Sequence, residues 1–195
     1  MNAVHPEPER QVQAVRELRH WIERCGRGDA GALRLFYDRL APRALALAAR
    51  ILRTQSDAEE VVQESFLHVW KRARDYDPTR GEPDAWLVTI VRSRAIDRLR
   101  SRASAERTVL ASAKEPPPPS AISPLEDAEK RAERERIAAA LGGLPDEQRT
   151  CLELAYYEGL SHSQIAERTG APLGTVKTRL KLAVDKLGLL LGGSR

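Results

Sequence analysis

The chain has 195 residues, of which 31% are charged and 5% aromatic, so we expect one large or two small domains with aliphatic cores. Its formal net charge is +4, its pI is near 9.3, and the abundance of Ala, Leu, Arg and Glu favours helices. Residues 1–10 hold no apolar segment and no run approaches about 18 apolar residues, which excludes a signal peptide and membrane insertion and predicts a cytoplasmic protein.

Two cysteines, Cys25 and Cys151, lie far apart in the sequence. They form no CxxC pair and have no histidine at metal-ligand spacing, so we expect no metal and no cofactor. A reduced cytosolic protein is the simplest interpretation, and a regulatory disulfide between the two is the alternative.

Residues 1–17 are polar and contain two prolines, so we expect them to be disordered. A helical domain is predicted from 18 to 102. Asp29 is placed to cap a first helix, and residues 44–52 are apolar nearly all round, which predicts that they are buried.

The next helix is predicted from Ser56 or Asp57, either of which could cap it, with Glu59 and Glu60 complementing the dipole of the first turn. Its apolar residues repeat every three to four positions and form one stripe: Val61, Val62, Ser65, Phe66, Val69 and Trp70. Two prolines and a glycine then predict a loop over 75–83.

A further helix is predicted over 84–100, with an inner face of Trp86, Leu87, Ile90, Val91, Ile96 and Leu99. Its second half is basic, because five arginines stand against one acid: Arg92, Arg94, Arg98, Arg100 and Arg102 against Asp97. Such a cluster is typical of a site for a polyanion, and a solvated helix face is the alternative interpretation.

Residues 103–134 contain four consecutive prolines and scattered charges, which predicts a flexible linker. Helices resume over 135–192, so the expected fold is all-α, with two small helical domains joined by a flexible, proline-containing linker. About 30 flexible residues relax to roughly 30 Å, whereas two DNA elements about 20 base pairs apart are roughly 70 Å apart. A large partner must therefore set the spacing if both domains bind DNA.

A helix-turn-helix is predicted over 160–180. Ser161 is a plausible cap, the small residue Ala166 allows close helix packing, and Gly170 supplies the turn. Val176 lies ten residues after Ala166 and packs the second helix against the first. Pro172 suits the first turn of the second helix. An ordinary αα-hairpin is the alternative. A catalytic triad around Ser161 is disfavoured, because no acid or oxyanion partner lies at a recognisable spacing.

Four segments in order resemble a bacterial sigma factor of the extracytoplasmic-function (ECF) group: 57–70, 86–100, 144–149 and 172–179. The resemblance covers roughly residues 20–102 and 135–190, and the chain has only a linker where housekeeping sigma factors have a larger middle domain. It implies a non-enzymatic transcription factor with sigma domain 2 and sigma domain 4. Its implied partners are core RNA polymerase, promoter DNA and an anti-sigma factor that is often membrane-anchored, with no small-molecule substrate.

The resemblance also implies site residues. Acidic and apolar residues of the 57–70 helix would bind a basic coiled coil of the polymerase, with the polar ones facing outward: Asp57, Glu60, Gln63, Glu64, Phe66 and Trp70. The alternative is that some of these acids, Glu59 above all, only cap and solubilise the helix.

The 84–102 helix and the loop before it would contact the −10 element through Tyr76, Arg80, Arg92, Ser93, Arg94, Asp97, Arg98 and Arg100. Tyr76 and Arg80 could hold a flipped base, although Tyr76 could also merely cover the helix junction. Trp86 is interpreted as core rather than as a stacking platform. Ser93 and Asp97 share a face, and the family most often has Asn where this chain has Ser93, which affects the −10 sequence rather than the function.

In the second domain, Val176, Leu180, Ala183 and Leu187 are expected to face the core. This leaves Thr175, Lys177, Thr178, Arg179 and Lys181 for the −35 element. Some of these must contact only phosphates, which position the helix without specifying sequence.

Two alternatives remain. A dimeric helix-turn-helix repressor leaves the 57–70 and 84–102 motifs unexplained, and the sequence holds no dimerisation heptads. A nuclease would need clustered carboxylates or a metal site, and the sequence shows neither.

Overall fold

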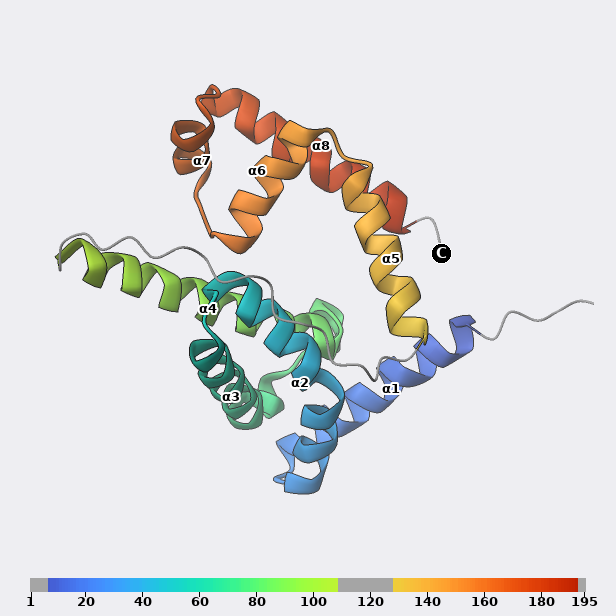
Figure 1. Ribbon diagram of the computed structural model, residues 1–195. Helices are drawn as coiled ribbons and strands as arrows, with labels where there is room; N and C mark the ends of the chain where they lie inside the picture. Colours follow the sequence, from blue (N-terminus) through green and yellow to red (C-terminus); the bar gives the residue numbers. More distant parts are fainter. Residues whose placement is uncertain (1–6, 109–127, 193–195) are drawn as a thin grey trace, which may run out of the picture. The chain divides into compact units, whose positions relative to one another are not determined.

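The computed structural model describes residues 7–108 and 128–192, and every regular element within those residues is helical (Figure 1). The chain divides into two compact units. The first unit holds α1 (Glu7–Gly26), α2 (Ala30–Leu52), α3 (Gln55–Arg72), the 3₁₀ turns η1 (Ala73–Asp75) and η2 (Pro78–Arg80), and α4 (Pro83–Thr108). The second holds α5 (Ala128–Gly142), α6 (Asp146–Tyr157), α7 (His162–Thr169) and α8 (Leu173–Gly192). The expected all-α fold with two helical domains is confirmed.

The helices extend beyond the limits expected from the sequence. Helix α1 begins at Glu7, α4 continues to Thr108 and α5 begins at Ala128, so parts of 1–17 and 103–134 are helical. These added turns are rich in Ala, Glu and Arg, which have high helix propensity. The proline run at 116–119 lies outside the described residues.

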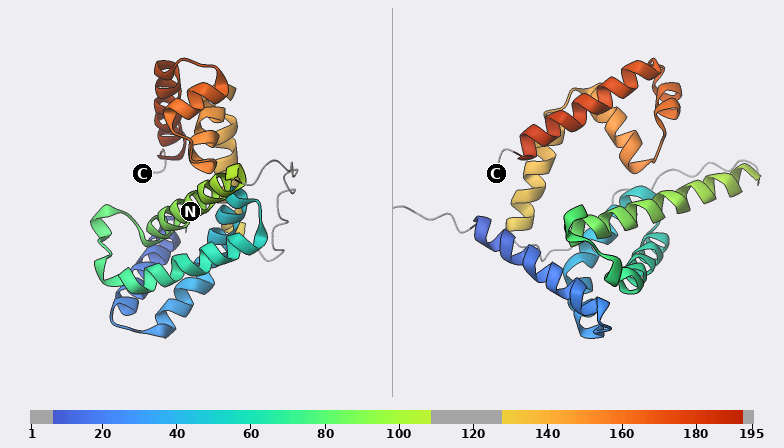
Figure 2. Two further views of the ribbon diagram at one scale, coloured as in Figure 1. Left: turned by 90° about the vertical axis from the view of Figure 1, so that its left-hand side faces the viewer. Right: turned by 180° about the vertical axis from the view of Figure 1, so that it is seen from behind.

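The core of the first unit lies where α2 packs against α3 and α4. Phe36, Val61 and Val91 are at most 1% exposed, and the rings of Phe36 and Phe66 meet edge to face at 6.0 Å. Helix α1 covers another side of α2, as the two views of Figure 2 show.

Helix α2 begins as predicted, because the Asp29 carboxylate accepts hydrogen bonds from the backbone N–H groups of Gly31 and Ala32. It runs through Pro42 without ending. The prediction that 44–52 is buried all round is wrong. Only one face, made of Ala44, Ala48, Ile51 and Leu52, is buried, while Ala46 and Arg50 are exposed.

A sharp turn joins α2 to α3. Arg53 adopts a left-handed conformation with φ of 57°, and Thr54 is the N-cap of α3. The predicted caps Ser56 and Asp57 therefore lie inside the helix, which begins at Gln55. This tight turn fixes where α3 starts relative to the end of α2.

The second unit contains the predicted helix-turn-helix. Ser161 and Gln164 form a capping box at the start of α7, and Gly170 ends it with φ of 67°. Ile165 and Val176 are fully buried around Cys151, while Ala166 is half-buried beside them. Leu180 and Ala183 are also buried and Leu187 is half-buried, so the predicted inner face of α8 is confirmed.

Candidate functional site

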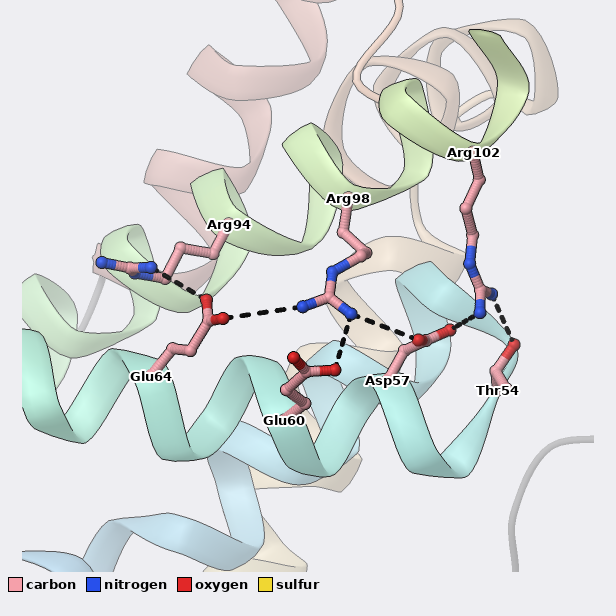
Figure 3. Close-up of polar contacts among 7 residues, drawn as sticks. All are labelled: Thr54, Asp57, Glu60, Glu64, Arg94, Arg98 and Arg102. Carbon is pink, nitrogen blue, oxygen red and sulfur yellow. Dashed lines mark hydrogen bonds and ion pairs between the residues drawn. The ribbon is translucent and has the colours of Figure 1, made fainter. Parts of the chain in front are cut away.

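Acidic side chains on α3 and arginines on α4 face each other along the two helices (Figure 3). The acids are spaced three and four residues apart and the arginines four residues apart, so each set occupies one helix face. We call the set the ion-pair ladder, and it consists of Asp57, Glu60, Glu64, Arg94, Arg98 and Arg102. The ladder joins residues that the sequence assigns to the polymerase with residues that it assigns to DNA.

Asp57 forms the buried end of the ladder and is only 7% exposed. Its carboxylate accepts a 3.4 Å hydrogen bond from Arg98 and forms an ion pair with Arg102. Arg102 also donates to the hydroxyl of Thr54 over 3.0 Å. The expectation that Asp57 faces outward is therefore wrong, because α4 covers it.

Arg98 lies in the middle of the ladder. Its Nη1 donates to Glu60 Oε2 over 2.8 Å, and its Nη2 lies 3.6 Å from Glu64 Oε1. The hydrogen bond from Arg98 holds the pKa of Glu60 below its usual value, and the same bond raises the pKa of Arg98. Both side chains therefore stay ionised across the physiological pH range.

Arg94 closes the outer end. It donates to Glu64 over 3.0 Å and lies 3.3 Å from Nδ1 of His68. Burial lowers the pKa of His68, and the positive charges of Arg94, Arg72 and Lys71 lower it further. His68 is therefore neutral at pH 7.

Two other candidate polymerase contacts border an apolar hollow between α2 and α3. The hollow has a volume of about 430 Å³ and is lined by Ala30, Leu33, Arg34, Tyr37, Gln63, Phe66 and Leu67. Gln63 is exposed, whereas Phe66 is 4% exposed with its ring 4.7 Å from that of Tyr37. Trp70 is half-buried against the cluster of Cys25, Ala32 and Ala73, so it supports α1 rather than the hollow.

A different face of α4 carries the remaining candidates for the −10 element. Ser93, Asp97 and Arg100 are exposed at spacings of four and three residues, so they form one stripe. Arg92 is half-buried. The structure thus separates these residues from the arginines of the ladder.

The loop between α3 and α4 holds Tyr76 and Arg80. The Tyr76 hydroxyl donates to the carbonyl of Gly81 over 2.8 Å, and its ring lies 5.4 Å from the ring of Trp86. Trp86 is half-buried rather than part of the closed core. The half-buried Tyr76 ring thus packs against the start of α4, while Arg80 is exposed.

The exposed face of α8 carries Thr175, Lys177, Thr178 and Lys181. Arg179 differs from them, because it is half-buried and its Nη2 lies 3.8 Å from Glu147 on α6. The Thr178 hydroxyl donates to the carbonyl of Gly174, one turn earlier. Four of the five predicted residues therefore share open access to a ligand.

Within residues 7–108 and 128–192, no group of three or more His, Cys, Asp or Glu side chains is placed to hold a metal ion. No helix among those residues is long and apolar enough to cross a membrane. Cys25 and Cys151 are free thiols, and each is buried.

The region 2 model of the sigma-70 family matches residues 36–105, and a region 4 model of the same family matches 134–187. The ECF RNA polymerase sigma factor SigK of Mycobacterium ulcerans is 37% identical over 179 residues, which cover 91% of this chain and 95% of that relative. The chain belongs to the ECF sigma factor family. The SigK of Mycobacterium tuberculosis is 36% identical to this sigma factor over 167 residues, covering 85% and 89% of the two chains.

A solved structure is also similar to this sigma factor. It is the Rhodobacter sphaeroides SigE in complex with the anti-sigma ChrR, at 29% identity and a TM-score of 0.44. The match covers 87% of this chain and 93% of that one.

Sequence reasoning did not identify the pairing inside this sigma factor. Arg102 was counted in the basic cluster but not among the residues expected to contact the −10 element, and Thr54 and His68, which contact the ladder, were not predicted at all. The spacing of Arg94, Arg98 and Arg102 on one face, opposite an equally regular acidic face, was the available signal.

Proposed function

We propose that this sigma factor binds core RNA polymerase, directs it to −35 and −10 promoter elements, and promotes DNA opening. One observation supports the proposal above all. The chain has two separate units, of which the first is matched by the region 2 model of the sigma-70 family and the second by a region 4 model. A sigma factor needs both, because one unit must hold the −10 element while the other holds the −35 element.

The second unit would bind the −35 element through the exposed face of α8. Lys177 and Lys181 supply charge for phosphates or for guanine edges, and Thr175 and Thr178 supply hydroxyl groups. Arg179 would act mainly by orienting α8 on α6 through Glu147.

The first unit would bind the −10 strand through the stripe of Ser93, Asp97 and Arg100 together with Arg80 of the loop. Arg94 and Arg98 would serve chiefly to hold α4 on α3. With α4 held in this way, the DNA-facing surface is already in place before the strand arrives. It could therefore hold an unstacked base without ATP.

The polymerase would dock on the outer side of α3, at the hollow lined by Gln63, Phe66 and Leu67. Leu67 is 55% exposed, which suits an apolar contact. Glu60 and Glu64 lie on the same helix and supply negative charge toward a basic partner. Asp57 would have a supporting role, since α4 covers it.

Control by an anti-sigma factor is part of the proposal. The similar Rhodobacter sphaeroides SigE was solved with the anti-sigma ChrR. We expect this sigma factor to work in the cytoplasm, at the nucleoid or held by such a partner, and to have no catalytic activity of its own.

Run-off transcription on a genomic fragment library tests the proposal. Purified bacterial core polymerase is assayed with and without the full chain. New start sites preceded by a common two-part element support the sigma function. DNA binding without any start site that depends on the chain overturns it and favours the dimeric repressor.

A further inference from the structure

Helix α1 touches both ends of the loop that precedes α4. At the start of the loop, Arg74 Nε donates to the backbone carbonyl of Gly26 over 2.6 Å. At its end, Arg19 donates to Glu82 through two parallel hydrogen bonds of 2.8 and 2.6 Å. Because a guanidinium–carboxylate fork fixes orientation as well as distance, α1 sets where the loop begins and ends.

The loop itself is closed by short internal bonds. Asp77 accepts from the backbone N–H of Thr79 over 2.9 Å and from its hydroxyl over 2.7 Å. Tyr76 donates to Gly81, whose φ is 139°. Burial raises the pKa of Tyr76, and the Glu82 carboxylate raises it further, so the hydroxyl retains the proton that it donates.

The packing beneath the loop also comes from α1. Ala73 is 5% exposed and packs against Cys25 of α1 and Ala32 of α2, with Trp21 and Trp70 beside them. The loop therefore rests on α1 through apolar contact and is bonded to it at each end. Yet the region 2 model of the family begins at residue 36, so it leaves out α1 entirely.

We propose that α1 positions the loop over 73–82 for reading the −10 strand, with Arg19 and Glu82 as its positioning residues. The inference rests on the proposed function, since it assumes that Arg80 and the Tyr76–Trp86 pair meet that strand. A base-reading surface must be held within about 0.5 Å, which a loop of two short turns does not achieve alone. The fork from α1 supplies the missing constraint.

A purely stabilising ion pair is the alternative, and the exposure of the pair argues against it. The side chains of Arg19 and Glu82 are 42% and 40% exposed. Ion pairs with this access to water add little to folding stability. Removing the pair should therefore change strand binding far more than it changes unfolding.

The test measures holoenzyme binding to a fluorescent single strand that carries the −10 sequence found by run-off transcription, and to its single-base variants. Arg19→Ala and Glu82→Gln are compared with Arg43→Ala. Arg43 forms a 3.0 Å ion pair with Asp84, which lies on α4 beyond the loop over 73–82, so it is a matched control. Core binding and urea unfolding are measured for every variant.

We expect Arg19→Ala to weaken binding of the preferred strand about fivefold and to flatten base preference at one position. Core binding and the unfolding midpoint should stay near those of the unmodified chain. Arg19→Lys keeps the charge but loses the fork, so it should behave like Arg19→Ala. The exchanged pair, Arg19→Glu with Glu82→Arg, should regain part of the preference.

Unchanged base preference in Arg19→Ala overturns the proposal, as does an equal loss in Arg43→Ala. The outcomes differ from failure of the sigma function, which would appear as no start site with the unmodified chain. A lowered unfolding midpoint that accounts for the whole loss of binding would assign Arg19 a structural role instead.

Discussion

Arg98 donates to Glu60 over 2.8 Å, which ties a residue expected to contact DNA to a residue expected to contact the polymerase. The two lie 38 positions apart on different helices. A phosphate that approaches Arg98 must therefore compete with a carboxylate already bound there. The affinity of the free chain for DNA should depend on the acids of α3.

The first prediction concerns variants that lack the carboxylates competing with phosphate for Arg94 and Arg98. Glu60→Gln combined with Glu64→Gln should raise the affinity of the free chain for single-stranded DNA, because Arg94 and Arg98 become available to phosphates. The plot of log K against log salt should steepen by about 0.7 for each phosphate gained. Fluorescence anisotropy over a salt series measures both quantities.

Glu59→Gln is the matched control for this charge change. Glu59 is exposed and accepts a 2.7 Å hydrogen bond from Gln55, so its removal frees no arginine. If Glu59→Gln steepened the slope as much as each of the other substitutions, net charge alone would explain the effect.

A second prediction concerns Asp57. Asp57→Asn should lower the free energy of unfolding of the first unit by about 2 kcal/mol, because the variant leaves Arg98 and Arg102 without a buried carboxylate. Urea unfolding followed by tryptophan fluorescence is specific for this unit, since Trp21, Trp70 and Trp86 all lie in it.

Asp38→Asn provides the comparison for Asp57. Asp38 lies 3.8 Å from Arg34, and both side chains are well exposed, so we expect a change below about 0.5 kcal/mol. Equal losses of unfolding free energy in the two variants would show that the burial of Asp57 does not contribute to stability.

The third prediction concerns pH. Burial and Arg94 lower the pKa of His68 from the ordinary value of 6.5, so the unfolded chain binds the proton more readily than the folded one. The stabilisation is full above pH 6.5 and is lost as pH falls from there through the folded pKa. The unfolding midpoint should therefore drop between pH 7 and 5, and His68→Gln should reduce this drop. An identical pH profile in His68→Gln would contradict the assignment.

The fourth prediction separates the two faces of α8. Lys177→Ala should weaken binding of the second unit's −35 target and reduce the salt slope by about 0.9 if the lysine contacts one phosphate. Lys186 is also exposed and lies nine residues further on, which places it on the opposite side of the helix. Lys186→Ala should leave the slope unchanged. Equal effects would mean that α8 binds DNA only through its total charge.

Local signals were sufficient for much of the fold. Asp29, Ser161 and Gly170 mark helix ends through bonds or dihedral angles that lie within three residues, so the sequence alone predicts them. The added turns of α1, α4 and α5 were missed because the proline and charge content of the flanking segments outweighed their helix propensity.

The candidate site was predicted less well, because its decisive contacts join distant positions. The sequence placed Asp57 at the start of a helix, facing outward, whereas the packing of α4 buries it under Arg102. The fork between Arg19 and Glu82 spans 63 positions and has no local sequence pattern at all. Composition and spacing assign charge to a face, whereas tertiary packing decides which partner that charge meets.

Cys25 is 3% exposed in the first unit and Cys151 is fully buried in the second, and the chain has no other cysteine. Burial also raises the pKa of the Cys25 thiol, which slows its reaction with alkylating reagents. Each unit therefore holds one buried thiol that a labelling reagent reaches only when that unit opens. The rate at which either sulfur takes up a label reports how often its own unit opens, and peptide mass mapping follows both in one sample.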